Sequence, residues 1–438
     1  MEGTDSGHNN PLENSPYWLD TLRVETQSAA GPAFEGGARF DVAVVGGGYT
    51  GLAAARQLAR RGASVAVLER GQMGAGASSR NAGQVLTGLK LEPRVLVAKY
   101  GERRAQELFE ISQHAIDELE AVVSDEHIDC ELARTGHLQA AAKPSHFAAF
   151  RDEQALLARV FNHTVSLIPE REQTSELGAI GYHGLMLDEE SRALNPAKYV
   201  AGLSAAAARA GATLCPETAV ERVSRVAAGW LVETSRGHIT AKDVLFATNG
   251  YTDRASPALQ RRLIPIGSYI IVTAPLDQAV AVRLLPKRRM VFDSRYFLHY
   301  FRLTADNRLL FGGRAEFSGP TLESAKRAQA ILHRAMTAIF PELAGTKIDY
   351  AWSGHVAFAR DQMPHAGLLD GLFYAGGYAG HGIAMATQLG AAIAKRMAGE
   401  SISHPLFDDH FAPIPLYYGR PWFLPLVGLY YRWLDWIS

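Results

Sequence analysis

The sequence predicts an α/β (mixed α+β) fold, in which a parallel-sheet domain built from separate stretches of chain carries an inserted β-rich domain. Three observations lead to this prediction. A complete strand–helix–strand unit lies within residues 40–69, a strand pattern that rejoins the same sheet ends at residues 247–250, and another strand, glycine-rich turn and helix follow at 371–399. The stretch 264–315 between them is rich in strand-forming residues and indicates an inserted sheet.

The first unit has the glycine pattern of a Rossmann-like dinucleotide-binding domain. An apolar strand leads into GGGYTG, a helical pattern stops at Gly62, and a second apolar strand ends on Glu69. Gly46 permits a tight turn, Gly48 lets the backbone approach a pyrophosphate, and Gly51 lets the helix pack closely on the strand. The helix N-terminus would face the phosphates, and Glu69 could accept hydrogen bonds from ribose hydroxyls. These features together predict a bound adenine dinucleotide, since a glycine-rich turn in another doubly wound fold leaves Glu69 unexplained.

The composition argues against several classes of function. The chain has 438 residues and a formal net charge of −1, from 44 basic and 45 acidic residues, so it has no basic field for nucleic acid. Cys130 and Cys215 form neither a metal spacing nor a disulfide framework, and the histidines show no HxxxH spacing, so we expect no metal site. The polar N-terminus and the lack of a run of 18 uncharged apolar residues lead us to expect a cytoplasmic protein without signal or membrane span.

Local signals place the boundaries of the elements. Asn195-Pro196 is a good helix start because Asn can cap a helix and Pro suits its first turn. Asp306-Asn307 suits a hairpin turn, and apolar residues at helical spacing predict helices within 101–160 and 325–340. The predicted domains are an N-terminal arm (1–37, partly disordered), the nucleotide-binding domain (38–100, 170–255 and 350–405), a substrate domain (101–169 and 256–349) and an aromatic tail (406–438).

Two further glycine-rich segments complete the predicted cofactor site. In GAGASSRNAGQ, residues 74–84, small residues allow close approach to a long flat ligand, and Arg80 could contact a phosphate or a ring carbonyl; the alternative is a flexible surface loop. GGYAGHG, residues 376–382, precedes a helix whose positive N-terminal end would stabilise the anion of a reduced flavin, which a nicotinamide does not need. The predicted cofactor-binding residues are Gly46, Gly48, Tyr49, Thr50, Gly51, Glu69, Arg70, Gly76, Ala77, Ser78, Ser79, Arg80, Asn81, Ala82, Gly83, Gln84, Val220, Thr248, Asn249, Gly250, Gly377, Gly380, His381, Gly382 and Ile383.

These segments resemble the FAD-dependent family that includes D-amino-acid oxidase, glycine oxidase and monomeric sarcosine oxidase. The matching pieces are GGGYTGLAAA…VLE, GAGASSRNAGQ, the LNP helix start, ATNGYT and GGYAGHGIAMATQLG, which together span nearly all of residues 40–400. Within the family, GASSRNAGQV, YFRLTADNRLLFGGR and the aromatic tail are most similar to the γ-glutamylputrescine oxidoreductase type. The resemblance implies that a hydride passes from the carbon beside an amine nitrogen to flavin N5, and that water hydrolyses the resulting imine.

Departures from the family pattern bear on the substrate and on the attachment of FAD. Sarcosine oxidase-like members carry a lysine for the substrate carboxylate where this chain has Ala384, and a lysine that promotes reaction with oxygen where it has Leu310. They also attach FAD through a cysteine, whereas neither cysteine here lies near the corresponding segment, 356–361. The comparison therefore implies non-covalent FAD, a small amine as substrate, and either oxygen or a quinone as electron acceptor.

Several aromatic and polar residues of the inserted domain and its exit are candidates for the substrate site. We single out His381, His355, Tyr269 and Tyr300 as candidate catalytic residues, although for His381 alone a hydrogen-bonded turn histidine is an equal alternative. No general base is assigned, because hydride transfer requires mainly a neutral, well-oriented amine. The other candidates for the pocket wall are Tyr296, His299, Arg302 and Trp352.

Three functions remain open on the sequence. The first is FAD-dependent oxidation of an amine, with a γ-glutamylputrescine-like compound as the model substrate. The second is oxidation of an amino acid such as proline, pipecolate or a D-amino acid, whose carboxylate Arg302, Arg314 or Arg360 would hold. The third is a flavin-binding partner protein without turnover.

The C-terminal segment 413–438, PIPLYYGRPWFLPLVGLYYRWLDWIS, is dense in aromatic and apolar residues. It is too short and too interrupted to span a bilayer. It could lie on the inner face of a membrane, where aromatic rings are favoured and where electrons could pass to a quinone. Alternatively, it docks on the protein body or on a partner subunit.

Overall fold

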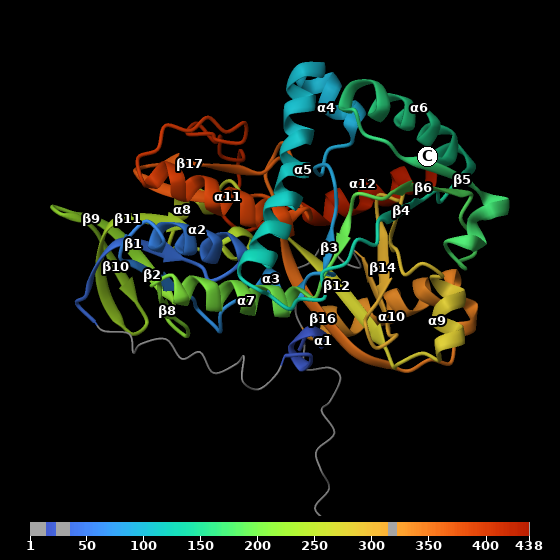
Figure 1. Ribbon diagram of the computed structural model, residues 1–438, viewed down its shortest axis with the longest axis horizontal. Coiled ribbons are helices and arrows are strands. Elements are labelled where there is room, and N and C mark those ends of the chain that lie inside the picture. Colours follow the sequence, from blue (N-terminus) through green and yellow to red (C-terminus); the bar gives the residue numbers. More distant parts are fainter. Residues whose placement is uncertain (1–14, 23–35, 314–321, 438) are drawn as a thin grey trace, which may run out of the picture.

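The computed structural model describes residues 15–22, 36–313 and 322–437. Two sheets of eight strands each lie side by side, with helices packed around both (Figure 1). The expected disorder at the extreme N-terminus and Arg314 lie outside the described residues.

The first sheet is largely parallel and joins three stretches of chain that are far apart in sequence. Its strands are, in sheet order, β17 (His365–Leu369), β18 (Leu372–Gly376), β11 (Gly237–Phe246), β1 (Arg39–Val45), β2 (Val65–Leu68) and β8 (Thr213–Cys215), with β10 (Gly229–Thr234) beside β11 and β9 (Val220–Val226) beside β10. β1 pairs in parallel with β2 and β11, and β11 pairs in parallel with β18. The last four residues of β1 are all buried, as expected for a strand covered on both faces. The α/β fold class and the return of the chain to this sheet near residue 247 are thereby confirmed.

Three helices on this sheet were anticipated from local signals. They are α2 (Tyr49–Ala59), α7 (Pro196–Arg209) and α11 (Gly382–Met397). The amide N–H of Lys198 donates to Asn195 Oδ1 at 3.2 Å, so the predicted cap of α7 is present. α11 passes close to the start of α2, because a Cβ on Gly390 would lie only 2.3 Å from the Thr50 carbonyl oxygen. α11 is thus packed against the N-terminal glycine motif.

The second sheet is mixed and contains the predicted insertion. Its strands are, in order, β16 (Ile348–Phe358), β12 (Ile264–Thr273), β15 (Leu309–Gly313), β14 (His299–Leu303), β13 (Met290–Asp293), β4 (His137–Ala140), β6 (Gly184–Asp188) and β5 (Ser166–Pro169). β14 and β15 form the predicted hairpin, with Asn307 at φ +62° in its turn. β6 and β16 belong to this sheet. The sequence prediction placed β6 and most of β16 in the nucleotide-binding domain, within residues 170–255 and 350–405. The domain boundaries stay a prediction.

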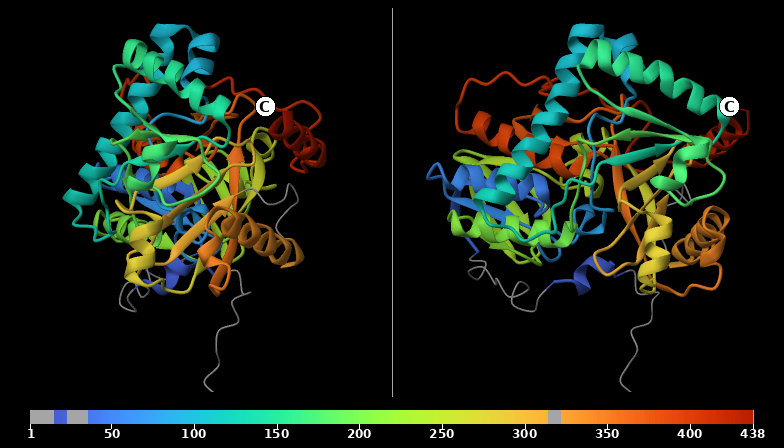
Figure 2. Two further views of the ribbon diagram at one scale, coloured as in Figure 1. Left: turned by 90° about the vertical axis from the view of Figure 1, so that its right-hand side faces the viewer. Right: turned by 45° about the vertical axis from the view of Figure 1, so that its right-hand side comes forward.

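Two of the remaining helices, α6 (Pro144–Phe161) and α10 (Leu322–Ile339), pack on the second sheet. α6 lies over β5 and β6, and α10 packs on β12 and β15 (Figures 1 and 2). β4 was missed because it is a short strand between two strongly helical patterns. The other elements are α1 (Tyr17–Asp20), α3 (Ala77–Arg80), β3 (Gln84–Val85), α4 (Pro93–Tyr100), α5 (Glu102–Asp125), β7 (Arg192–Ala193), α8 (Pro257–Gln260), α9 (Gln278–Leu284) and α12 (Leu424–Ile437).

The aromatic tail begins docked and continues as an exposed helix. Leu424 is buried against Ile266, Phe358 and Ala379, and the Tyr417 hydroxyl donates to the Leu263 carbonyl at 3.0 Å. Beyond this point Leu426, Leu429 and Tyr430 of α12 are exposed to solvent. Within the described part of the chain, no helix has both the length and the apolar character needed to cross a bilayer.

Candidate cofactor and substrate site

A cavity of about 530 Å³ is lined by residues from both sheets and is called the site cavity below. Its walls include the ends of β1, β2 and β11 on one side and of β12, β13 and β16 on the other. The predicted site residues that line it are Gly46, Gly48, Tyr49, Thr50, Glu69, Arg70, Gly76, Ala77, Ser78, Arg80, Asn81, Ala82, Gln84, Val220, Thr248, Asn249, Gly380, His381, Gly382, Ile383, His355 and Tyr300.

The first glycine motif has the shape expected for a phosphate cradle. Gly46 has φ +106°, and a Cβ there would lie 2.9 Å from the Ala247 carbonyl oxygen, so no other residue fits without strain. Gly48 caps α2 in an ordinary extended conformation, so its missing side chain leaves space rather than relieving strain. The Glu69 carboxylate accepts from the Gly47 amide at 2.7 Å and the Gly71 amide at 3.0 Å. Glu69 therefore also orders the turn into which a ribose would fit.

Five of the predicted cofactor residues do not line the site cavity. Gly51, Gly83 and Gly250 act through packing. Their Cβ positions would lie 2.0 Å from the Gly46 carbonyl oxygen, 2.1 Å from the Leu194 carbonyl oxygen and 3.0 Å from the His355 Cβ, respectively. Gly377 donates its amide to Asn249 Oδ1 at 2.9 Å, and Ser79 is buried behind the wall.

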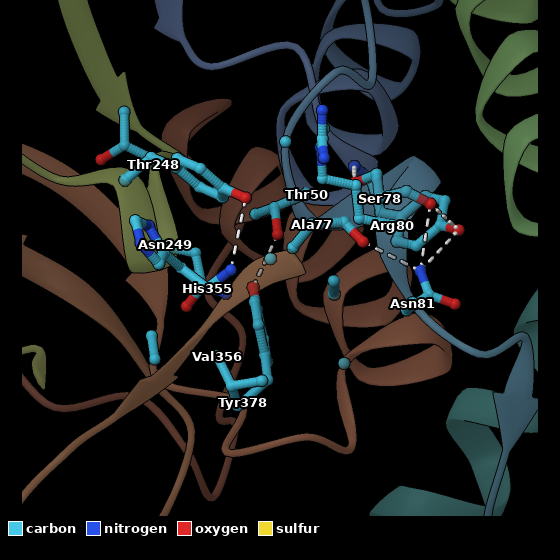
Figure 3. A pocket seen from close by; sticks show the side chains of 18 of the residues that line it. Thr50, Ala77, Ser78, Arg80, Asn81, Thr248, Asn249, His355, Val356 and Tyr378 are labelled. Atoms are coloured by element: carbon cyan, nitrogen blue, oxygen red, sulfur yellow. Dashed lines mark hydrogen bonds between the residues drawn. The ribbon is translucent and has the colours of Figure 1, made fainter. Parts of the chain in front are cut away.

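The three glycine-rich segments lie next to one another and are joined by hydrogen bonds. The Thr50 and Tyr378 hydroxyls are 2.7 Å apart and link the N-terminal motif to the C-terminal one; Figure 3 shows the two side chains pointing toward each other. The Tyr49 amide donates to Ser78 Oγ at 3.1 Å, which ties the same motif to the middle segment. One rigid wall of the site cavity is thus built from three distant parts of the sequence.

Two histidines line the wall with a buried, unpaired nitrogen each. Nδ1 of His355 and of His381 has no hydrogen-bond partner within the described ranges. Burial lowers the pKa of His381 to about 3, with smaller contributions from the charges of Lys90 and His137, and burial followed by Arg80 lowers the pKa of His355. Both rings are therefore neutral near pH 7. Each neutral ring can donate a hydrogen bond to a ligand or accept one from it, but neither carries an extra proton near pH 7.

The candidate tyrosines separate into one wall residue and one core residue. Tyr300 lines the site cavity, and its hydroxyl lies 2.9 Å from Ser268 Oγ. Tyr269 is buried in the hydrophobic core of the second sheet and does not line the site cavity, whereas its neighbours Ser268 and Ile270 do. Successive side chains of a strand point to opposite faces, so the choice of Tyr269 put the wrong face of β12 toward the site.

Arg302 and Arg360, two of the three arginines considered as carboxylate clamps, are not placed for that task, and Arg314 lies outside the described residues. Arg302 is buried behind the wall, and its Nη1 donates to the Gly83 carbonyl at 2.8 Å and the Leu194 carbonyl at 3.0 Å. Burial lowers its pKa to about 10. Arg360 lies on an exposed turn and does not line the site cavity. Of the other pocket candidates, His299 pairs with Asp293 at 3.2 Å, Tyr296 is half-exposed and Trp352 is buried.

The sequence prediction did not include several residues of the cavity wall. Among them are Leu86, Lys90, Tyr251, Phe292 and Leu298. Leu86 and Lys90 follow the middle glycine segment closely, so continuing that segment by six residues beyond Gln84 finds a cationic side chain. Phe292 and Leu298 lie on β13 and the loop after it, for which the sequence offers no comparable signal.

Comparison with known proteins identifies the class of enzyme. Residues 41–396 match the family model described as FAD dependent oxidoreductase. Among curated proteins, the γ-glutamylputrescine oxidoreductase of Escherichia coli is 33% identical over 86% of this chain and 87% of its own length. A probable oxidoreductase, OrdL, of Rhizobium meliloti is 34% identical over 84% of this chain and 86% of its own length. Glycine oxidase from Geobacillus kaustophilus has a similar structure, with a TM-score of 0.70, 22% identity and coverage of 87% of this chain and 100% of that one.

The chain therefore belongs to the FAD-dependent oxidoreductase family. The resemblance inferred from the glycine segments, the fold class and the dependence on FAD are confirmed. The site cavity fits such a cofactor, because it holds a side-chain-free cradle, two unpaired buried histidine nitrogens and enough volume for a ligand with a flat ring.

Proposed function

We propose that FAD binds along the site cavity and that the protein oxidises a C–N bond of a small amine. The observation that carries the proposal is the convergence of three glycine-rich segments on one cavity that they share with the second sheet. The turn at Gly46–Gly48 and the N-terminus of α2 would hold the pyrophosphate, and Glu69 the ribose. Residues 76–84 and the start of α11 would hold the ring system. When bound, FAD supplies the hydride acceptor.

The chain itself prepares the substrate for this reaction. Phe292, Leu298 and Leu86 give the substrate end an apolar wall that excludes water. The same low polarity that keeps His381 neutral disfavours an ammonium ion, so a bound amine is expected to lose its proton. A neutral amine is the form whose α-carbon can release a hydride. Tyr300, His355 and His381 would orient it by hydrogen bonds rather than act as strong bases.

A γ-glutamylputrescine-like amine is the leading substrate, by analogy with the Escherichia coli relative. The second candidate is an amino acid such as proline, pipecolate or a D-amino acid. One observation favours a substrate that bears a carboxylate, as these amino acids and γ-glutamylputrescine all do. Lys90 lines the site cavity, and its charge contributes to the lowered pKa of His381. A cation at this position would attract a carboxylate at the far end of the substrate.

Anaerobic flavin bleaching tests these substrates directly. The purified yellow protein is mixed without oxygen with putrescine, γ-glutamylputrescine, proline, pipecolate and D-alanine, and loss of the visible flavin band is recorded. We expect γ-glutamylputrescine or a similar amine to bleach the flavin fastest, and Lys90→Met to raise the KM only for compounds with a carboxylate. Bound FAD that no amine or amino acid reduces would refute the proposed reaction and favour a flavin-binding protein without turnover.

Readmitting oxygen or a quinone to the bleached protein identifies the acceptor.

The exposed apolar side chains of the tail, Trp422, Leu426 and Leu429, are each between 63 and 64% exposed and suit a membrane surface. We therefore propose peripheral membrane contact through α12, with electrons passing to a quinone. Wild-type protein should sediment with vesicles of anionic phospholipid, and a Trp422→Ser/Leu426→Ser/Leu429→Ser variant should not. Equal sedimentation of both proteins, or none of either, would exclude the membrane role.

A further inference from the structure

Residues 16–22, part of the predicted N-terminal arm, are called the arm below. Hydrogen bonds join the arm to the second sheet and to a helix of the first sheet. The Tyr17 hydroxyl donates to Asp306 Oδ1 at 2.6 Å in the β14–β15 hairpin, and the Tyr350 hydroxyl on β16 donates to Asp20 Oδ2 at 2.8 Å. Asn195, at the start of α7, donates through Nδ2 to Thr21 Oγ1 at 2.8 Å. These bonds join the second sheet to a helix of the first sheet. Trp18 lies on the same four-residue helix and is only 1% exposed.

Trp18 reaches the back of the cavity wall formed by the middle glycine-rich segment. Its indole N–H donates to the Asn81 carbonyl at 2.8 Å. Trp352 of β16 donates in the same way to the Arg80 carbonyl at 2.9 Å, and Arg302 donates to the Gly83 carbonyl at 2.8 Å. Three N–H donors from outside the segment therefore bind three carbonyl groups within residues 80–83.

This arrangement turns the peptide groups of the wall in one direction. A trans peptide places its N–H opposite its C=O. Because the carbonyls of Arg80 and Asn81 accept from Trp352 and Trp18, the N–H groups of Asn81 and Ala82 point away from these indoles. Asn81 and Ala82 both line the site cavity. Such N–H groups can donate to the polar edge of a flat ligand. The direction in which they point depends on the donors behind them.

Trp18 also covers the buried Arg302. The guanidinium carbon lies 5.7 Å from the centre of the Trp18 ring, and Arg302 is 6% exposed. Removing the ring would let water reach the guanidinium and weaken its hold on the Gly83 carbonyl. The arm thus supports two of the three bonds behind the wall, one directly and one by shielding.

We propose that Trp18 is a positioning residue for FAD, which acts by fixing the orientation of peptides 80–83 through its indole N–H and its cover over Arg302. This inference rests on the proposed placement of FAD in the site cavity. It assigns the arm a task in cofactor binding that goes beyond bracing the two sheets.

Trp18→Phe tests the proposal, because it removes the N–H donor and keeps an aromatic ring over Arg302. Tyr17→Phe is the matched control, since it removes one hydrogen bond of the same helix to Asp306 and none to the wall. We measure the dissociation constant of FAD on reconstitution, the visible circular dichroism of the bound flavin, and the unfolding free energy without FAD. Trp18→Phe should weaken FAD binding about fivefold, the size expected for one hydrogen bond, and change the flavin spectrum. Tyr17→Phe should leave both at wild-type values.

The outcomes separate this inference from the proposed function. If Trp18→Phe and Tyr17→Phe bind FAD with the same affinity and spectrum, the arm is only a brace and the inference fails, while wild-type protein remains yellow and reducible. Should Trp18→Phe not fold, Trp352→Phe and Trp18→His replace it. Trp352→Phe should weaken FAD binding like the loss of any donor behind the wall, and Trp18→His, which keeps a ring N–H, should bind FAD more tightly than any Trp18 variant without a donor. Wild-type affinity in Trp352→Phe or equal affinities for Trp18→His and Trp18→Leu would overturn it. Wild-type protein that never binds FAD would instead overturn the proposed function.

Discussion

Replacing Gly48 or Gly51 of the first motif by alanine should affect different properties of the protein, although the two glycines are only three residues apart. A Cβ on Gly51 would lie 2.0 Å from the Gly46 carbonyl oxygen and 3.0 Å from Val44 Cγ1, so α2 would have to move off β1. A Cβ on Gly48 would meet only the Ser78 hydroxyl, at 2.9 Å, and a hydroxyl can rotate away. Gly51→Ala should therefore damage the fold, and Gly48→Ala should damage the cofactor site.

The expected magnitudes follow from these contacts. Overpacking at Gly51 costs up to about 3 kcal/mol, and the better helix propensity of alanine returns up to about 1 kcal/mol, which leaves a net loss of about 2 kcal/mol in the free energy of unfolding. At Gly48, where φ and ψ suit any residue, the net change is below about 1 kcal/mol. The methyl group of Gly48→Ala would displace a phosphate from the helix N-terminus. Loss of one charge-assisted hydrogen bond of about 1.5–3 kcal/mol would weaken FAD binding about 10- to 150-fold.

Urea unfolding of the FAD-free proteins and FAD titration of the refolded proteins measure both quantities. Gly51→Ala should show the lower unfolding midpoint, and Gly48→Ala the weaker FAD binding with near wild-type stability. The reasoning is refuted if Gly48→Ala binds FAD as tightly as wild type, or if the two variants lose the same stability and the same affinity.

Three further results are expected. The pKa of His381 in the folded protein, about 3, lies below its unfolded value, so the unfolded chain binds more protons between those pH values and stability falls as the pH drops through that window. FAD-free wild type should consequently lose about 1.6 kcal/mol more than His381→Gln between pH 6.5 and 5 in urea unfolding, and equal losses would show that the ring is solvated. Burial raises the pKa of Asp188, but bonds from His163 and Thr87 and the charge of His137 outweigh it and lower the pKa to about 2. Its ionised form therefore stabilises the fold by about 2 kcal/mol above pH 4, and the stability gap between wild type and Asp188→Asn should close as the pH falls from 4 to 2; a gap that does not depend on pH would contradict this assignment. Acid precipitation should release all flavin into the supernatant, because Cys130 and Cys215 do not line the site cavity, and flavin that stays in the pellet would indicate a covalent bond.

Most of the residues that the glycine-rich segments predicted line the site cavity, whereas several side chains contributed by the second sheet were not predicted. Gly46 and Gly48 predict a cofactor site because a pyrophosphate can approach the backbone closely only where the side chain is missing. The hairpin turn at Asn307 and the cap at Asn195 were equally local signals, and both are present in the structure.

Residues whose role depends on long-range packing were harder to place. Tyr269 was assigned to the site although the register of β12 against β15 and β16 turns it into the core, and register is set by distant strands. Arg302 has the chemistry of a carboxylate clamp, but it is buried among backbone carbonyls that the folded segment 80–83 brings to it. The contacts of Trp18 with Asn81 and Arg302 were unpredictable for the same reason, since both residues are distant from it in sequence.

The central claim is that three glycine-rich segments, far apart in sequence, hold one FAD. Its ring would be accessible to an amine substrate on the side that faces the second sheet. The most direct test is an anaerobic titration of the purified protein with a panel of amines and amino acids, followed by its absorption spectrum. The account predicts a flavin band that one class of these compounds bleaches completely and that Gly48→Ala protein largely lacks. A colourless wild-type protein, or a flavin equally retained by Gly48→Ala and reduced by none of the compounds, would contradict it.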